Sequence, residues 1–174
     1  MTQRPDASEY APYYEKYVSL VPVGNIVETL ETQLSETLGL LANVPEERGD
    51  FRYGPGKWTL RESIGHVSDT ERVFAYRMLR ISRGDQTPMT GFDQDKYVLG
   101  RPTSKARIQD LAQEFDTVRR ATLSLLQQFD PEAWTRRGTA NGMEVSTLAL
   151  AYITAGHELH HRAIFRDKYL AAAS

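Results

Sequence analysis

The chain has 174 residues, of which 40% are hydrophobic and 25% are charged, as in an ordinary globular protein. Its formal net charge is −2 and its arginines form no large cluster, so we expect no nucleic-acid partner. The absence of cysteine excludes disulfides, thiolate metal sites and a cysteine nucleophile. Histidines and carboxylates are then the strong ligands left for a transition metal.

The hydropathy pattern predicts no contact with a membrane. No apolar run approaches the roughly 20 residues that a membrane-spanning helix needs. The first ten residues are polar and contain no apolar signal region. We therefore expect a cytoplasmic protein, and the length suits one domain over residues 1–174.

Residues 1–22 are expected to form an N-terminal arm that is interrupted by prolines. Four tyrosines lie in its second half, namely Tyr10, Tyr13, Tyr14 and Tyr17. They could pack across the chain's own bundle or stack against a ligand. Because burial of aromatic rings is so favourable, we favour packing on the bundle.

Four stretches show apolar residues at spacings of three and four, which is typical of an amphipathic helix. The second begins at Thr59, which forms a capping box with Glu62. The third is expected to start with Thr103 or Ser104 as its cap, and Ser146 is the expected cap of the fourth. The stretches cover residues 23–42, 59–84, 103–129 and 146–170. They predict an all-α four-helix bundle.

Two of the connections have a character of their own. Residues 84–103 form a long connection rich in Gly, Pro, Asp and Thr, which we expect to act as a crossover or a lid. Asn141-Gly142 is a tight-turn signal, so a small hairpin or ordered loop is expected before the fourth helix.

Three of the four histidines lie close together in the fourth helix. His157 and His161 are four residues apart and share one face, which also carries Leu150 and Ile153. His160 lies to one side, at the edge of that face. Two inward imidazoles could each be neutral and hydrogen-bonded, or they could coordinate a metal, as helical pairs do in other bundles. The spacing alone leaves both interpretations open.

A third histidine ligand could come only from His66 in the second helix. It lies on the flank of the apolar stripe of that helix, so its spacing does not place it in the core. It could be a half-exposed surface residue. Its neighbours Ser63, Thr70 and Val73 are small and uncharged, and could instead face another helix.

Two ordered motifs resemble those of a known family. Residues 57–62 read Lys-Trp-Thr-Leu-Arg-Glu, residues 65–69 read Gly-His-Val-Ser-Asp, and residues 156–161 read Gly-His-Glu-Leu-His-His. They resemble the DinB-like (DinB/YfiT) superfamily, and the likeness runs from about residue 23 to 170. The resemblance implies an up-up-down-down style of bundle, often a homodimer. It also implies that His66, His157 and His161 surround one divalent metal, usually nickel or zinc.

The resemblance also narrows the function. Three imidazoles leave coordination positions open, which is the arrangement of a working metal. Relatives include transferases and isomerases that depend on a low-molecular-weight thiol, and others resemble hydrolases. We therefore expect a metal-dependent enzyme that acts on a small molecule by thiol transfer or hydrolysis. A thiol-binding pocket would be lined by the 84–103 connection and the turn near Asn141. The alternative is a non-catalytic metal-binding stress-response protein.

Three carboxylates near the histidines in sequence have competing interpretations. Glu71 lies on an apolar stripe and could be a buried acid or base, but we favour a core salt bridge to Arg77 or Arg119. Asp69 and Glu158 could orient ligand imidazoles, as carboxylates do around metal sites. For both we favour ordinary solvent-exposed helix charge.

Overall fold

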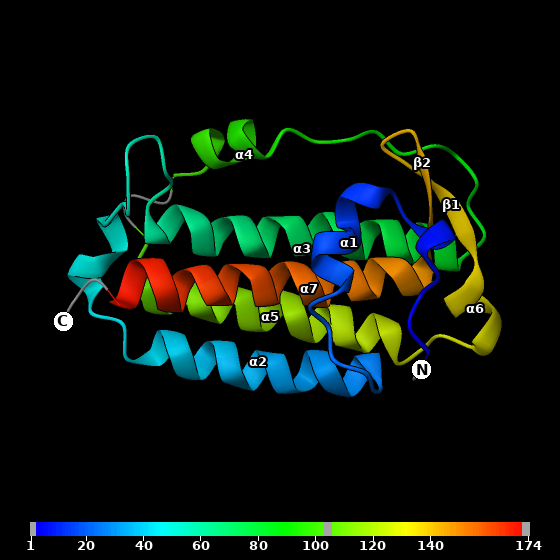
Figure 1. Cartoon of the computed structure of the whole chain (residues 1–174), viewed down its shortest axis with the longest axis horizontal. Helices are drawn as coiled ribbons and strands as arrows, with labels where there is room; N and C mark the ends of the chain where they lie inside the picture. Colours follow the sequence, from blue (N-terminus) through cyan, green and yellow to red (C-terminus); the bar gives the residue numbers. More distant parts are fainter. Residues whose placement is uncertain (1–2, 103–105, 172–174) are drawn as a thin grey trace.

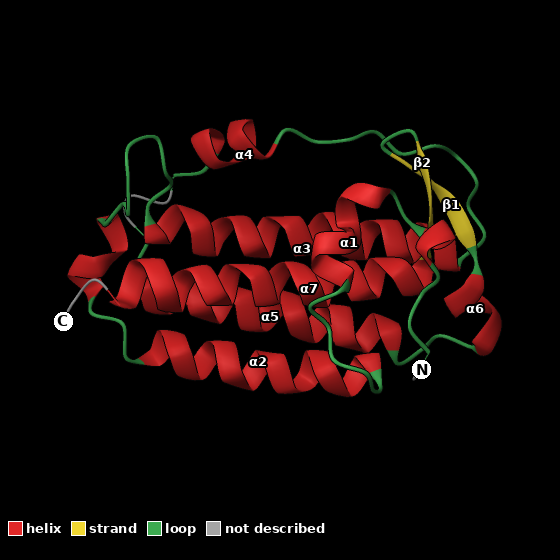
Figure 2. Ribbon diagram, in the orientation of Figure 1, coloured by secondary structure: helices red, strands yellow, loops and turns green. Residues whose placement is uncertain are grey.

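Four long helices lie side by side in the computed structural model, which describes residues 3–102 and 106–171 (Figures 1 and 2). The predicted four-helix bundle is therefore confirmed. Over these described ranges, no helix is long and apolar enough to cross a membrane. The long helices are α2 (Ile26–Ala42), α3 (Leu60–Ser82), α5 (Ile108–Leu126) and α7 (Thr147–Ile164).

The helix starts follow the capping signals in the sequence. The Thr59 side chain accepts from the Glu62 N–H while the Glu62 carboxylate accepts from the Thr59 N–H, which confirms the capping box. The Ser146 hydroxyl likewise accepts from the Ala149 N–H. Helix α5 begins at Ile108, with Arg107 in an extended conformation at its N-cap position, so the predicted start at residue 103 or 104 is wrong. Residues 103 and 104 themselves lie outside the described residues.

The order of helix directions differs from the expectation. In Figure 1, α2 and α7 run in one direction, and α3 and α5 run in the other. The bundle is therefore down-up-up-down rather than up-up-down-down. Residues 43–59 turn the chain back at one end, whereas residues 83–102 run back along the length of the bundle (Figure 1). The crossover makes α3 and α5 parallel.

Several short elements lie outside the four long helices and were not predicted from the sequence. They are too short for a hydrophobic period to develop, which is why the sequence pattern does not reveal them. The α-helical ones are α1 (Glu15–Val18), α4 (Gln94–Gly100) within the long crossover, and α6 (Pro131–Thr135). The 3₁₀ turns are η1 (Ala7–Glu9), η2 (Pro12–Tyr14) and η3 (Glu46–Asp50). The π-helical η5 (Phe165–Leu170) is different, because it continues α7 to residue 170, where the fourth helix was predicted to end.

The predicted hairpin is present before α7. Strands β1 (Arg137–Ala140) and β2 (Met143–Ser146) pair in antiparallel fashion. Asn141 and Gly142 both have positive φ, at 53° and 75°, as a two-residue type I′ turn requires. Met89 of the crossover hydrogen-bonds on both sides of Ala140, to Thr139 and Asn141. This pairing fixes the crossover against the hairpin.

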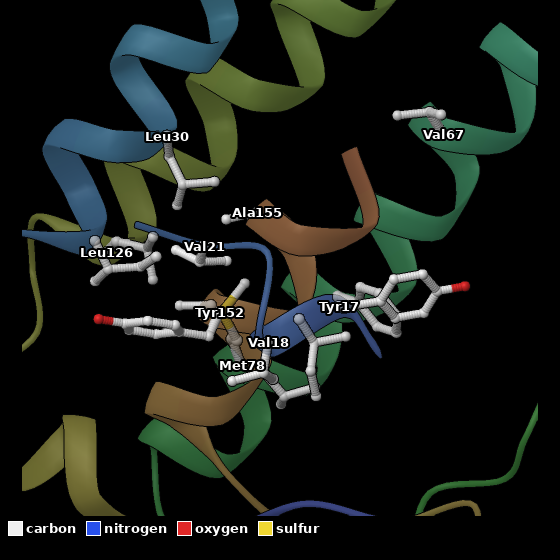
Figure 3. Close-up of a cluster of buried hydrophobic side chains, with 14 of the residues drawn as sticks. Tyr17, Val18, Val21, Leu30, Val67, Met78, Leu126, Tyr152 and Ala155 are labelled. Atoms are coloured by element: carbon white, nitrogen blue, oxygen red, sulfur yellow. The ribbon is translucent and has the colours of Figure 1, made fainter. Parts of the chain in front are cut away.

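The described part of the N-terminal arm packs on the bundle. Val18 and Val21 are buried beside Tyr152 and Ala155 of α7 (Figure 3). The arm and α7 approach each other closely at Gly156. A Cβ added at this glycine would lie 2.0 Å from the Tyr17 carbonyl oxygen. Glycine at this position therefore lets the arm cross directly over α7.

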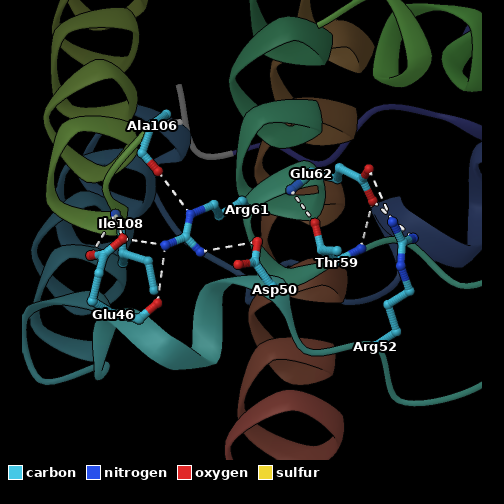
Figure 4. A network of polar contacts seen from close by, with 8 residues as sticks. All are labelled: Glu46, Asp50, Arg52, Thr59, Arg61, Glu62, Ala106 and Ile108. Carbon is cyan, nitrogen blue, oxygen red and sulfur yellow. Dashed lines mark hydrogen bonds and ion pairs between the residues drawn. The ribbon is translucent and has the colours of Figure 1, made fainter. Parts of the chain in front are cut away.

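A buried arginine ties the opposite end of the bundle together (Figure 4). The Arg61 guanidinium donates to the Ala106 carbonyl at 2.8 Å and pairs with Glu46 and Asp50. The Glu46 carboxylate also accepts from the Ile108 N–H at the start of α5. These contacts fix η3 and the start of α5 against the first turns of α3, close to His66.

Candidate metal site

Three histidines from two helices meet inside the bundle. His66 of α3 and His157 and His161 of α7 are 3%, 6% and 8% exposed. One ligand nitrogen from each lies within 4.8 Å of the other two. His66 is buried although it lies on the flank of the apolar stripe. The reason is that α3 packs against both α5 and α7, which together cover a wide part of its surface.

The ring nitrogens have the separations and free valences that suit a shared ion. His66 Nε2 and His157 Nε2 are 3.1 Å apart. Two nitrogens each about 2.0–2.1 Å from one zinc ion lie roughly 2.8–3.4 Å apart at bond angles near 90–110°. His161 Nδ1 is buried and has no hydrogen-bond partner among the described residues. A buried nitrogen with nothing to bond is costly, and a metal ion would satisfy it.

Burial keeps the imidazoles in the form that binds metals. It lowers the pKa of His66 to about 4, against a small opposing effect of Asp69. Burial, and then the neighbouring histidines, hold the pKa values of His157 and His161 well below their ordinary value. All three rings are therefore neutral at pH 7, and neutral imidazole is the ligand form.

Aromatic rings surround the cluster. The Trp58 ring lies 4.7 Å from that of His66, and the Tyr17 and Phe74 rings lie 5.3 and 6.2 Å from that of His157, between centroids. The Thr70 hydroxyl is 3.4 Å from His66 Nδ1, one turn along α3. That contact leaves His66 Nε2 facing His157. His160 is half-buried against Tyr17 and lies outside the cluster.

A cavity of about 470 Å³ opens over two of the three histidines. His66, Thr70 and His157 line its wall, together with Phe92 and Gln94 of the crossover and Asn141 of the hairpin. The crossover and the turn near Asn141, which were expected to line a thiol-binding pocket, line this cavity. The binding of a thiol there stays a prediction. Tyr13, Tyr14 and Tyr17 of the arm line it as well. Tyr14 and Tyr17 therefore both pack against the hydrophobic core and line the cavity, whereas Tyr13 is 61% exposed.

His161 faces a second, smaller cavity of about 240 Å³. Its wall includes Trp58, Ser63 and Tyr169. Cavities thus adjoin the histidine cluster on two sides. No sequence pattern predicts this smaller cavity, because its wall combines the loop before α3 with residues of α3, α4, α7 and η5.

The nearby carboxylates belong to ion pairs rather than to the cluster. Both Glu71 oxygens accept from Arg119, at 2.8 and 2.9 Å, so the favoured salt bridge is present. Asp69 is partly exposed and pairs with Arg101 at 2.6 Å. Glu158 is 2% exposed, accepts from the Thr37 hydroxyl and lies near Arg119. Both interpretations of Glu158 were wrong, since it is buried and bonds to no imidazole among the described residues.

Comparison with known families identifies the relatives of this chain. The family model described as the DinB superfamily matches residues 29–165. The chain belongs to the DinB superfamily. No curated protein matches this DinB protein in sequence.

Two solved structures share the fold of this DinB protein. One is YfiT from Bacillus subtilis, described as a probable metal-dependent hydrolase with an unusual four-helix bundle topology. It matches with a TM-score of 0.68 and 15% identity, over 92% of this chain and 88% of YfiT. The other is a mycothiol-dependent maleylpyruvate isomerase, with a TM-score of 0.66 and 16% identity. That match covers 82% of this chain and 62% of the isomerase.

Proposed function

We propose that this DinB protein is a divalent-metal-dependent enzyme in which His66, His157 and His161 hold one ion. The observation that carries the proposal is the buried three-histidine cluster at the wall of a cavity of about 470 Å³. No further histidine or carboxylate joins this cluster in the part of the chain that the structure describes. Three protein ligands beside accessible space are typical of a catalytic site, whereas structural sites have closed shells.

The ion would supply Lewis acidity, which lowers the pKa of a water molecule or thiol towards neutrality. The protein contributes positioning and exclusion of water. Thr70 orients the His66 ring, and the rings of Trp58, Phe74 and Tyr17 keep bulk water from the imidazoles. Burial raises the pKa of Tyr17, so its hydroxyl remains protonated at neutral pH and serves as a hydrogen-bond donor rather than a base.

The substrate is a small molecule, and the reaction is thiol transfer or hydrolysis. The cavity has the volume of a small-molecule site, and its aromatic wall carries the amides of Gln94 and Asn141. The two structural neighbours, one described as a metal-dependent hydrolase and the other as a thiol-dependent isomerase, favour testing both reactions. A non-catalytic stress-response role would favour a closed ligand shell, and the open cavity argues against it.

Activity after removal and return of the metal tests the proposal. The purified protein would be stripped with a chelator and reloaded with nickel or zinc. It would then be assayed with p-nitrophenyl acetate and with a low-molecular-weight thiol plus chlorodinitrobenzene. We expect turnover of at least one probe by the loaded protein, none by the stripped protein or by His157→Ala, and full turnover by His160→Ala. Equal turnover by the loaded and stripped proteins would contradict the proposal.

Four expectations from the sequence stay predictions. They are a preference for nickel or zinc, the use of a low-molecular-weight thiol, the homodimer and the cytoplasmic location. Sedimentation of the purified chain tests the homodimer. Competition between the two metals for the stripped protein tests the preference for one ion.

A further inference from the structure

Another cavity lies beside the cavity that His66 and His157 line, and the arginines on its wall carry positive charge. Its volume is about 470 Å³, and its wall combines arginines from α3 with aromatic rings. The arginines are Arg72, Arg77 and Arg80, and the rings are Tyr76, Phe92 and Tyr97.

Arg77 differs from the other two arginines of this cavity because no carboxylate of the described residues pairs with it. Arg72 pairs with Asp69 and Glu114, and Arg80 pairs with Asp85. Within residues 3–102 and 106–171, no carboxylate lies within ion-pairing distance of the Arg77 guanidinium. Glu71, one candidate partner, is occupied by Arg119.

The Arg77 side chain is nevertheless buried. The residue is 4% exposed, and its guanidinium donates one hydrogen bond, from Nη2 to the Thr90 carbonyl at 3.1 Å. A guanidinium has five N–H donors, so most of its donors are left for a ligand. A buried charge without a counter-charge is costly, which favours an anion at this position.

Arg77 is also aligned with the histidine cluster. It follows His66 by eleven residues of α3, which is three helical turns plus about 20°, so the two residues lie on nearly the same face. Their separation along the axis is about 16 Å. Phe92 lines both cavities, which makes them neighbours over this stretch of α3.

We propose that Arg77 is the anchor of an oxyanion subsite that binds a carboxylate or phosphate group of an elongated ligand. The reacting end of that ligand lies at His66 and His157, and its body passes Phe92. The rings of Tyr76 and Tyr97 flank the anionic end and suit a flat apolar portion next to it. The identity of the reacting end rests on the proposed function, whereas oxyanion binding at Arg77 does not.

The competing explanation is that Arg77 only holds the crossover to α3 through Thr90. Calorimetric titration of the chelator-stripped protein separates the two, because no metal is then present to bind the probe. The probes are phenyl phosphate, phenylacetate and uncharged benzyl alcohol. We expect saturable, millimolar binding of at least one of the two anions and none of the alcohol. The comparison of phosphate with carboxylate identifies the preferred group.

Three variants complete the test. Arg77→Gln should weaken binding of the anion at least tenfold, and Arg77→Lys should retain part of it. Arg83→Gln, which removes an exposed arginine after the last turn of α3, should leave binding unchanged. Thermal melting of each variant verifies that it is folded.

Absence of saturable binding to the wild-type protein would overturn the proposal, as would equal weakening by Arg83→Gln. Failure of the metal proposal would look different. In that case the protein would bind the anion through Arg77 and yet hold no ion at the histidines.

Discussion

The ion pair between Glu71 and Arg119 gives Glu71, the carboxylate on the apolar stripe of α3, a structural role. Arg119 is fully buried, and it also donates to the Leu30 carbonyl of α2 at 3.0 Å. The pair therefore joins α3, α5 and α2 at their centre. With both oxygens held by Arg119, Glu71 is not available as the acid or base of a reaction at the histidines.

Glu71→Ala should lower the free energy of unfolding by roughly 3–5 kcal/mol, because it leaves a buried guanidinium without its main partner. Urea denaturation measures the change. The control is Glu144→Ala, which breaks the exposed pair with Arg137 and should cost less than about 1 kcal/mol. A Glu71→Ala protein of unchanged stability with no turnover would instead support an acid or base role.

Deprotonation of Tyr10 is expected to lower the free energy of unfolding at alkaline pH. Burial, together with a hydrogen bond to Glu15, raises the pKa of Tyr10 to about 12 from an ordinary value of 10.0. Its contribution is therefore complete below pH 10 and is lost as the pH rises towards 12. We expect the loss of stability over this range to be smaller in Tyr10→Phe than in the wild type. Denaturation at a series of pH values tests this, and identical pH profiles would contradict it.

At the scale of elements, the crossing of the arm over α7 connects the fold to the site. Gly156 provides the close approach, and the next residue, His157, contacts the Tyr17 ring. The arm thus forms part of the cavity wall directly above the histidine cluster. The position of α1 and the shape of the site are coupled through this contact.

Gly156→Ala should displace the arm and destabilise the protein by about 1–3 kcal/mol, as overpacking does elsewhere. The matched control is Gly39→Ala in α2, where an added Cβ meets nothing within 4 Å. It should stabilise the protein by about 0.5–1 kcal/mol, because alanine is the better helix former. Urea denaturation of both variants is the measurement. An equal effect of the two substitutions would refute the close approach.

The long helices and the inward face that His157 and His161 share could be predicted because they depend on local patterns. Hydrophobic spacing marks α3 and α7, capping residues mark their starts, and the spacing of His157 and His161 places them on one face. The short α4 lacks such a period, and the direction of α5 depends on the path of the crossover. His66 and Glu158 are buried because of the neighbouring helices that their own helices pack against. The spacing of residues within one helix carries no information about those neighbours.

At the scale of the whole molecule, the bundle places donors from two helices around one point beside a cavity. The donors lie on α3 and α7, and the cavity wall adds the arm, the crossover and the hairpin. Segments distant in sequence thus meet at one site. This convergence, rather than any single motif, supports the proposal of a metal enzyme.

The most direct test is the metal content of the purified, untagged protein, measured by mass spectrometry. The wild type and His160→Ala are expected to hold about one transition-metal ion per chain, and the His157→Ala/His161→Ala double variant none. A wild-type protein that holds no metal, even after incubation with nickel or zinc, would contradict the account. The 3.1 Å contact between His66 and His157 would then be a hydrogen bond between two neutral core imidazoles.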